Sequence, residues 1–200
     1  MSLWLEPAVF PVVLDSCVLY PCELRDVLLE AAHYGLYGCI DLPKSWMMRL
    51  GICCKTKRIT EHRARKLRAA MEDVFPGTAV DPPAELAERI DCDPSDRHVA
   101  AAAMATKAEL IVTRNTRHFP AEALMPLGTK AVKPDQFLCN LLDLSESAIY
   151  TSLNKIVCRR AKHTDSSPVG IANALIESLK RDVKTFASRI SEFLVIEASP

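Results

Sequence analysis

The apolar residues of this chain alternate between short strand-like runs and helical repeats up to about residue 139, and follow helical repeats after it. The runs at 9–14, 110–113 and 130–132 predict buried strands, and the weaker run at 78–80 predicts a further short one. Apolar residues at three-to-four spacing predict helices at about 22–35, 43–50, 60–74 and 94–108, with the middle two forming a helical hairpin. A helix that leads into a strand is the crossover that builds a parallel sheet. The pattern therefore predicts an α/β fold with a central parallel sheet.

The last part of the chain has a helical pattern only. Ser167 and Pro168 have the form of a cap followed by a first-turn proline, and they predict one long helix from Val169 to Leu194. We expect this helical extension to pack on the α/β domain or to pair beside it. The predicted organisation is thus an α/β domain over 1–139 and a helical C-terminal extension over 140–200.

The balance of charged residues excludes a strong electrostatic field over the whole molecule. The chain has 200 residues, of which 49% are apolar, and 25 basic residues balance 25 acidic ones. Any contact with nucleic acid must then come from a local patch. No basic leader with an apolar stretch opens the chain and no apolar run is long enough for a membrane span, which predicts a cytoplasmic protein with no membrane partner. The eight cysteines show no C-x-x-C spacing and are interpreted as free thiols.

Acidic and amide residues follow the predicted strands. Asp15 ends the first strand, Asn115 follows the strand at 110–113, and Asp93 and Asp96 open the Ala-rich helix. Ligands bind at the carboxyl ends of strands in open α/β sheets, so these side chains are expected to share one edge. Carboxylates brought together there repel one another unless a cation lies between them. A hard divalent ion with oxygen ligands is the natural candidate.

Three stretches resemble the PIN-domain family, most closely the VapC toxins of toxin–antitoxin pairs. They are 12–20, 93–102 and 111–120, and with 134–138 they span about 9–140 in the family's order. The helical tail is similar to the C-terminal extension of one VapC-like subgroup. The resemblance implies a three-layer α/β/α fold and cleavage of RNA phosphodiesters with Mg²⁺ or Mn²⁺ as cofactor. The partners it implies are RNA and an inhibitory antitoxin-like protein, and a homodimer is a further option.

The resemblance also implies roles for single residues. Asp15 and Asp96 match the family's metal-binding acids, and Asn115 falls at a further catalytic position, where it orients water or supports the metal ligands. The alternatives are structural, since Asp15 can cap the segment after its strand and Asp96 can belong to an ordinary helix start. The residues expected to support the ligands or to cap helices are Asp93, Ser16 and Thr113.

Two departures from the family pattern bear on activity. The helix that usually supplies a Glu has Ser45 at the matching place, and Asp41 one turn earlier is the other substitute ligand. Asn115 is uncharged, and His118 stands where the motif commonly has Asp before Phe. Fewer ligand charges weaken the binding of a hard cation. The sequence therefore leaves two functions open: a metal-dependent ribonuclease, or a catalytically weak PIN-fold protein that binds an antitoxin-like partner or RNA.

Two groups of basic residues are candidates for RNA contact. Arg114 and Arg117 flank Asn115 at a strand end and can bind phosphate. A second, denser group lies within 55–68. The alternatives are a surface turn for the first group and a solvated helix face for the second.

Overall fold

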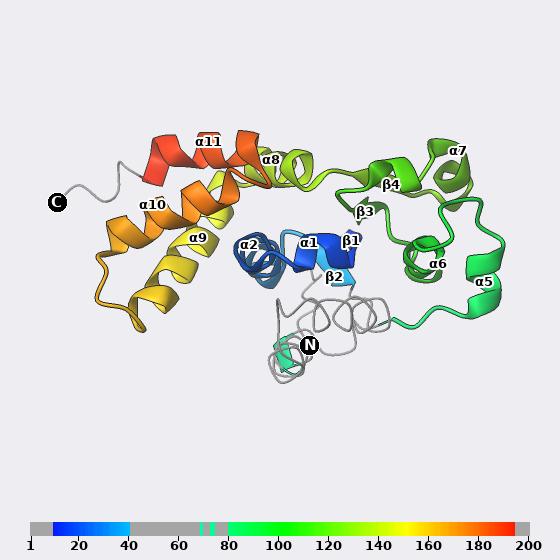
Figure 1. The fold of residues 1–200 in the computed structure, drawn as a ribbon, viewed down its shortest axis with the longest axis horizontal. Helices are drawn as coiled ribbons and strands as arrows, with labels where there is room; N and C mark the ends of the chain where they lie inside the picture. Colours follow the sequence, from blue (N-terminus) through cyan, green and yellow to red (C-terminus); the bar gives the residue numbers. More distant parts are fainter. Residues whose placement is uncertain (1–9, 41–68, 70–72, 75–79, 195–200) are drawn as a thin grey trace, which may run out of the picture.

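A four-stranded parallel sheet lies at the centre of the molecule. The structure, a computed structural model, describes residues 10–40, 69, 73–74 and 80–194. Its strands are β1 (Pro11–Leu14), β2 (Gly38–Ile40), β3 (Leu110–Val112) and β4 (Lys130–Val132), in the order β2-β1-β3-β4 (Figure 1). Val13 of β1 pairs with Ile40 on one side and with Ile111 on the other. All four carboxyl ends therefore lie at one edge of the sheet.

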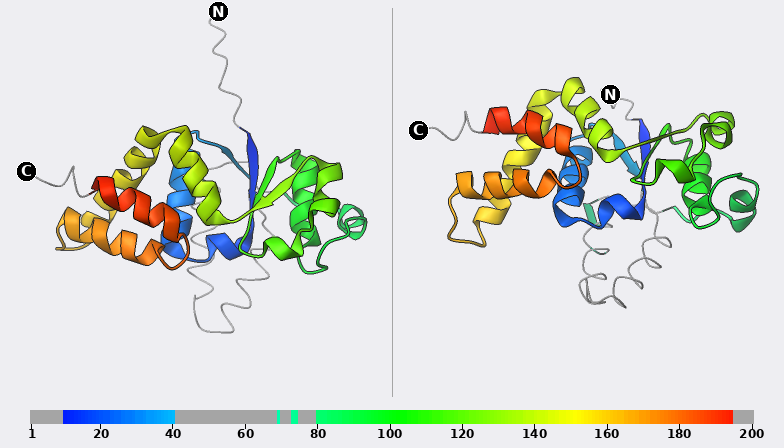
Figure 2. Two further views of the ribbon diagram at one scale, coloured as in Figure 1. Left: turned by 90° about the horizontal axis from the view of Figure 1, so that it is seen from above. Right: turned by 45° about the horizontal axis from the view of Figure 1, so that its top comes forward.

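Helices cover both faces of this sheet (Figure 2). Successive strand residues face opposite sides. Val12 and Leu14 pack in a core with α2 (Cys22–His33) and the C-terminal helices, while Val13 and Ile111 pack in a second core with α6 (Arg97–Thr106). The helices are α1 (Ser16–Leu19), α2 (Cys22–His33), α5 (Ala84–Glu88), α6 (Arg97–Thr106), α7 (Ala121–Leu124), α8 (Pro134–Leu144), α9 (Glu146–Ala161), α10 (Pro168–Leu179) and α11 (Lys184–Leu194), with 3-10 turns η1 (Thr116–His118) and η2 (Met125–Leu127). The predicted α/β fold class is confirmed, and the arrangement is consistent with a PIN fold.

The sequence pattern located three of the strands and missed one. The strand predicted at 130–132 is β4, and those at 110–113 and 9–14 are β3 and β1 with slightly shorter bounds. The missed strand β2 has only three residues and no alternating pattern, and its pairing with β1 defines it. The predicted helices at 43–50 and 60–74 and the strand at 78–80 lie almost entirely outside the described residues.

The Ala-rich helix begins later than predicted. It was expected from Pro94, but α6 starts at Arg97. The Asp93 carboxylate accepts hydrogen bonds from the backbone N–H of Ser95 at 2.9 Å and from its hydroxyl at 2.6 Å. The N–H of Asp96 also donates to the carbonyl of Asp93 at 2.9 Å. Asp93 therefore caps a turn that precedes the helix, and Asp96 takes the helix N-cap position.

The single long helix predicted at the C-terminus is wrong. Two helices, α10 and α11, pack against each other and are joined by a connector at 180–183 (Figure 1). The apolar residues of both helices face the same core, so their spacing continues through the break. The Asp135 carboxylate of α8 accepts from the N–H groups of Thr185 at 3.2 Å and Phe186 at 2.9 Å. A residue distant in sequence thus caps α11 and stabilises the break.

The C-terminal helices also contact α2 through charged side chains. Glu30 of α2, which is buried, lies 3.2 Å from Lys155 Nζ and 3.0 Å from an Arg159 guanidinium nitrogen of α9. Arg160 forms a second pair with Asp26 at 2.9 Å. The predicted division at 139 falls inside α8 and remains a prediction. Within the described part of the chain, no helix is both long and apolar enough to cross a membrane.

Candidate metal site

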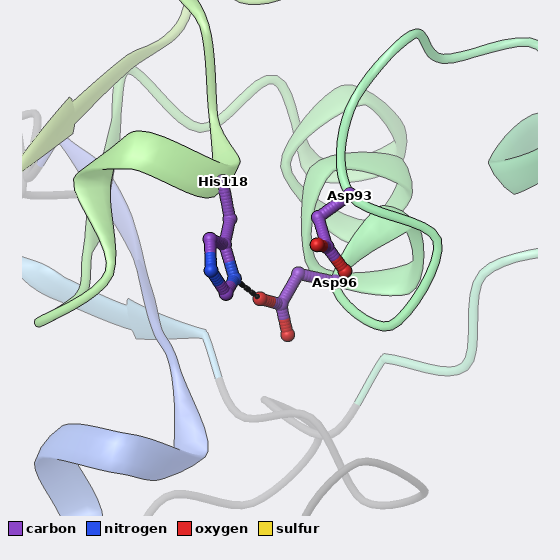
Figure 3. Close-up of side chains that lie close together, drawn as sticks. All are labelled: Asp93, Asp96 and His118. Carbon is purple, nitrogen blue, oxygen red and sulfur yellow. Dashed lines mark hydrogen bonds and ion pairs between the residues drawn. The ribbon is translucent and has the colours of Figure 1, made fainter.

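Asp93, Asp96 and His118 come together between η1 and the start of α6. One ligand atom from each residue lies within 4.8 Å of the others. Asp96 is fully buried, and its Oδ2 is 2.6 Å from Nδ1 of His118, whose side chain is 34% exposed. Figure 3 shows the His118 ring and the Asp96 carboxylate facing each other, with Asp93 beside them. Because their ligand atoms are close enough to hold one metal ion, we call these three candidate ligands the metal-ligand group.

Backbone hydrogen bonds hold this group in place. The N–H of Asp93 donates to the carbonyl of His118 at 3.1 Å, which fixes η1 against the turn before α6. The N–H of His118 donates to the carbonyl of Asn115 at 2.9 Å. Phe119, the next residue, is buried in the second core. The position of His118 therefore depends on contacts with two separate segments.

The donor atoms of the metal-ligand group fit a divalent cation. Carboxylate oxygens are ligands of hard cations, and imidazole suits transition metals such as Zn²⁺ or Fe²⁺. Hydrogen bonds from the Ser95 hydroxyl and amide lower the pKa of Asp93 and favour its anionic form, which is the form that binds metal. Among the described residues, Asp93, Asp96 and His118 form a group of acidic and His side chains whose spacing suits a metal ion.

Asp15 lies at the end of β1, is fully buried, and is not part of the metal-ligand group. Its Oδ1 accepts from the hydroxyl of Ser16 at 3.2 Å and from the N–H of Cys17 at 3.4 Å. Its Oδ2 accepts from the hydroxyl of Thr113 at 2.7 Å and from the thiol of Cys17 at 3.0 Å. The carboxylate therefore caps α1, as its structural interpretation predicted. Its role as a metal ligand remains a prediction.

Cys17 is a member of this site that the sequence did not indicate. Burial, and then the charge of Asp15, raise the pKa of its thiol to about 12. The thiol therefore stays protonated and donates to Asp15, while its sulfur accepts from the backbone N–H of Arg114 at 3.2 Å. The sequence signal that could have indicated Cys17 is its position two residues after an Asp at a strand end, within the first turn of a helix.

Hydrogen bonds connect Asp15 to the metal-ligand group. The Thr113 hydroxyl, which donates to Asp15, also accepts from the N–H of Asn115 at 3.1 Å. Asn115 in turn binds His118 through its carbonyl, and His118 contacts Asp96. Residues predicted from three separate stretches are thus linked in one network at the carboxyl edge of the sheet.

The remaining predicted site residues have different surroundings. Arg114 is exposed and pairs with Asp182 in the connector between α10 and α11. Arg117 is exposed on η1. Asp41 and Ser45, the two substitute ligands, lie outside the described residues, as does the basic group at 55–68.

Comparison with known proteins finds a relative for about half of this chain. No family model matches the chain. The chain is 40% identical over 94 residues to a protein of Mycobacterium tuberculosis (strain ATCC 25618 / H37Rv) described as "Putative ribonuclease VapC50". The two proteins are homologous over this region. The resemblance to VapC proteins predicted from the sequence is therefore confirmed. The aligned region covers 47% of this chain and 53% of the mycobacterial protein, so the chain spans about half the length of that relative.

Proposed function

We propose that this protein is a metal-dependent ribonuclease of the VapC kind that cleaves RNA phosphodiesters with Mn²⁺ or Mg²⁺. The main support is the convergence of Asp93, Asp96 and His118, whose ligand atoms lie within 4.8 Å of one another near the sheet edge where α/β proteins bind ligands. The homologous region gives independent support, because the description of the mycobacterial relative names a ribonuclease. An antitoxin-like protein and a second copy of the chain are further proposed partners.

Asp96, Asp93 and His118 would hold the cation in this proposal. When bound, a divalent cation supplies charge stabilisation to the phosphate that is attacked. Asp96 is best suited as the central ligand, because it is buried and its carboxylate faces His118. Asp15, the other predicted ligand, would approach the same edge of the sheet from the end of β1.

Asn115 would orient the attacking water. Its backbone is fixed at both ends, by the hydroxyl of Thr113 and by the N–H of His118. The Asn115 side chain makes no capping hydrogen bond to η1, so its amide group is not used to cap that turn. An amide can accept a hydrogen bond through its oxygen and donate through its nitrogen, which is sufficient to position a water molecule.

His118 bears on the choice of metal. Imidazole is a neutral ligand and favours first-row transition metals, whereas Mg²⁺ prefers a shell of oxygen atoms. In the related motif an Asp commonly stands at this position. We therefore propose that the site prefers Mn²⁺ to Mg²⁺.

The test is a cleavage assay on bulk RNA with Mn²⁺, with Mg²⁺ and with EDTA. Asp96→Asn removes the charge of the central ligand, and we expect cleavage to fall by at least about 10-fold, the lower end of losses seen when groups around a metal are removed. Asp91→Asn is the matched control, because Asp91 is an exposed acid in the same loop. Equal metal-dependent cleavage by Asp96→Asn and wild type would refute the proposed metal role.

A second candidate function is a catalytically weak PIN-fold protein that binds RNA or an antitoxin-like partner. The observation that favours it is the set of donors around Asp15 from Ser16, Cys17 and Thr113. A carboxylate has about four acceptor sites, and these donors use sites that a metal ion would otherwise need. If the wild-type protein binds RNA but does not cleave it under any metal condition, this second function is supported.

A further inference from the structure

An ion pair joins the candidate site to the C-terminal helices. The guanidinium of Arg114, just beyond β3, contacts the carboxylate of Asp182 in the connector at 180–183. The backbone N–H of Arg114 binds the Cys17 sulfur, so this residue is tied to the surroundings of Asp15 as well. The connector between α10 and α11 therefore lies next to the carboxyl edge of the sheet (Figures 1 and 2).

Three further hydrogen bonds bring a third segment to the same place. The N–H of Thr113 donates to the carbonyl of Val132 at 3.0 Å, which places the end of β4 beside the end of β3. Lys133 follows directly, and two residues later Asp135 binds the N–H groups at the start of α11. The segments at 114–117, 133–135 and 180–185 are thus linked by hydrogen bonds or an ion pair, although they are far apart in sequence.

These segments contribute exposed cations. Arg117, Lys133 and Lys184 are exposed, and within the described part of the chain none of the three forms an ion pair. The two acids of the same segments have other partners, since Asp135 caps α11 and Asp182 holds Arg114. We call Arg117, Lys133 and Lys184 the edge cations. Their charges are not neutralised by the segments that contain them.

We infer that the edge cations bind the phosphate backbone of single-stranded RNA, so that the C-terminal helices form part of the substrate-binding surface. This inference rests on the proposed ribonuclease function. Lys and Arg side chains neutralise phosphates and release counterions, and this contribution needs no base recognition. The Arg114–Asp182 pair serves as an anchor, because it fixes the connector, and with it Lys184, beside the strand that leads to Asn115.

The test uses the full chain with a short fluorescent single-stranded RNA in EDTA, which removes the divalent ions needed for cleavage. Binding is followed by anisotropy over a range of salt concentrations. We expect Lys133→Gln/Lys184→Gln to weaken binding several-fold at low salt. Its slope of log affinity against log salt should fall by about 1.4, because each lost phosphate contact on a single strand contributes about 0.7.

The matched control is Arg89→Gln/Lys162→Gln, which removes the same charge from exposed residues at the end of α5 and just after α9. The inference is supported if the control keeps the wild-type slope while the edge variant does not. It is overturned if the two double variants behave alike, or if the wild type does not bind RNA. A slope change without any cleavage in Mn²⁺ would support this surface and refute the ribonuclease function.

Discussion

The hydroxyl of Thr113 donates to the carboxylate of Asp15 at 2.7 Å across 98 residues of sequence. The register of the sheet causes this contact, because Leu14 of β1 pairs with Val112 of β3 and the next residue of each strand lies at the same edge. The same hydroxyl accepts from Asn115, so Thr113 supports two residues of the candidate site.

Thr113→Val should destabilise the fold without a change of side-chain shape. Hydrogen bonds to charged groups contribute about 1.5–3 kcal/mol, and we expect a loss of this order in the free energy of unfolding measured with urea. Thr151→Val is the control, since the Thr151 hydroxyl binds a backbone carbonyl on an exposed helix face. If both variants unfold at the same urea concentration as wild type, the hydroxyl of Thr113 does not stabilise the buried Asp15.

His118→Asp should change the metal preference. A third carboxylate adds a negative charge and an oxygen ligand, so Mg²⁺ affinity should rise and the preference for Mn²⁺ should shrink. Calorimetric titration of each ion gives both affinities without an activity assay. His163→Asp, at an exposed residue after α9, is the control. An unchanged ratio of Mn²⁺ to Mg²⁺ affinity would exclude His118 from the ligand set.

Ser45→Glu should tighten metal binding if Ser45 occupies the Glu position of the family. This prediction rests on the sequence, because the residue lies outside the described part of the chain. If Asp41 already supplies the ligand, Asp41→Ala should weaken binding and the added Glu should crowd the site. No change in metal affinity for either variant would mean that this segment contributes no ligand.

Asp135→Ala should loosen the start of α11. Loss of a capping side chain costs about 0.5–2 kcal/mol, and the amides of Thr185 and Phe186 should exchange with solvent faster. Asp135→Asn keeps one of the two oxygen acceptors that these amides use, so it should loosen the start of α11 less than Asp135→Ala does. Unchanged exchange at both amides in Asp135→Ala would mean that another contact fixes the break between α10 and α11.

Local patterns were sufficient for much of the fold. Leu110–Val112 is a short apolar run, Lys130–Val132 is a short strand-like run before a proline, and α2 and α6 each have their own three-to-four repeat. Because a parallel sheet places every strand end at one edge, the positions of Asp15 and Asn115 in sequence also predicted where they lie. Whether Asp15 binds metal remains a prediction, since its donors explain its burial equally well.

The sequence alone predicted β1, β3, β4, α2 and α6, because these follow from hydrophobic spacing within each segment, and with them the segments that meet at the sheet edge. Only the tertiary structure decided the features that depend on distant partners. β2 is a strand because β1 supplies its hydrogen bonds, and the C-terminal helix divides in two where Asp135 caps α11. The backbone N–H of Asp93 donates to the carbonyl of His118 and so holds η1 against the turn before α6. This contact brings the His118 side chain to Asp96. No local periodicity encodes such contacts, since each requires a group from another part of the chain.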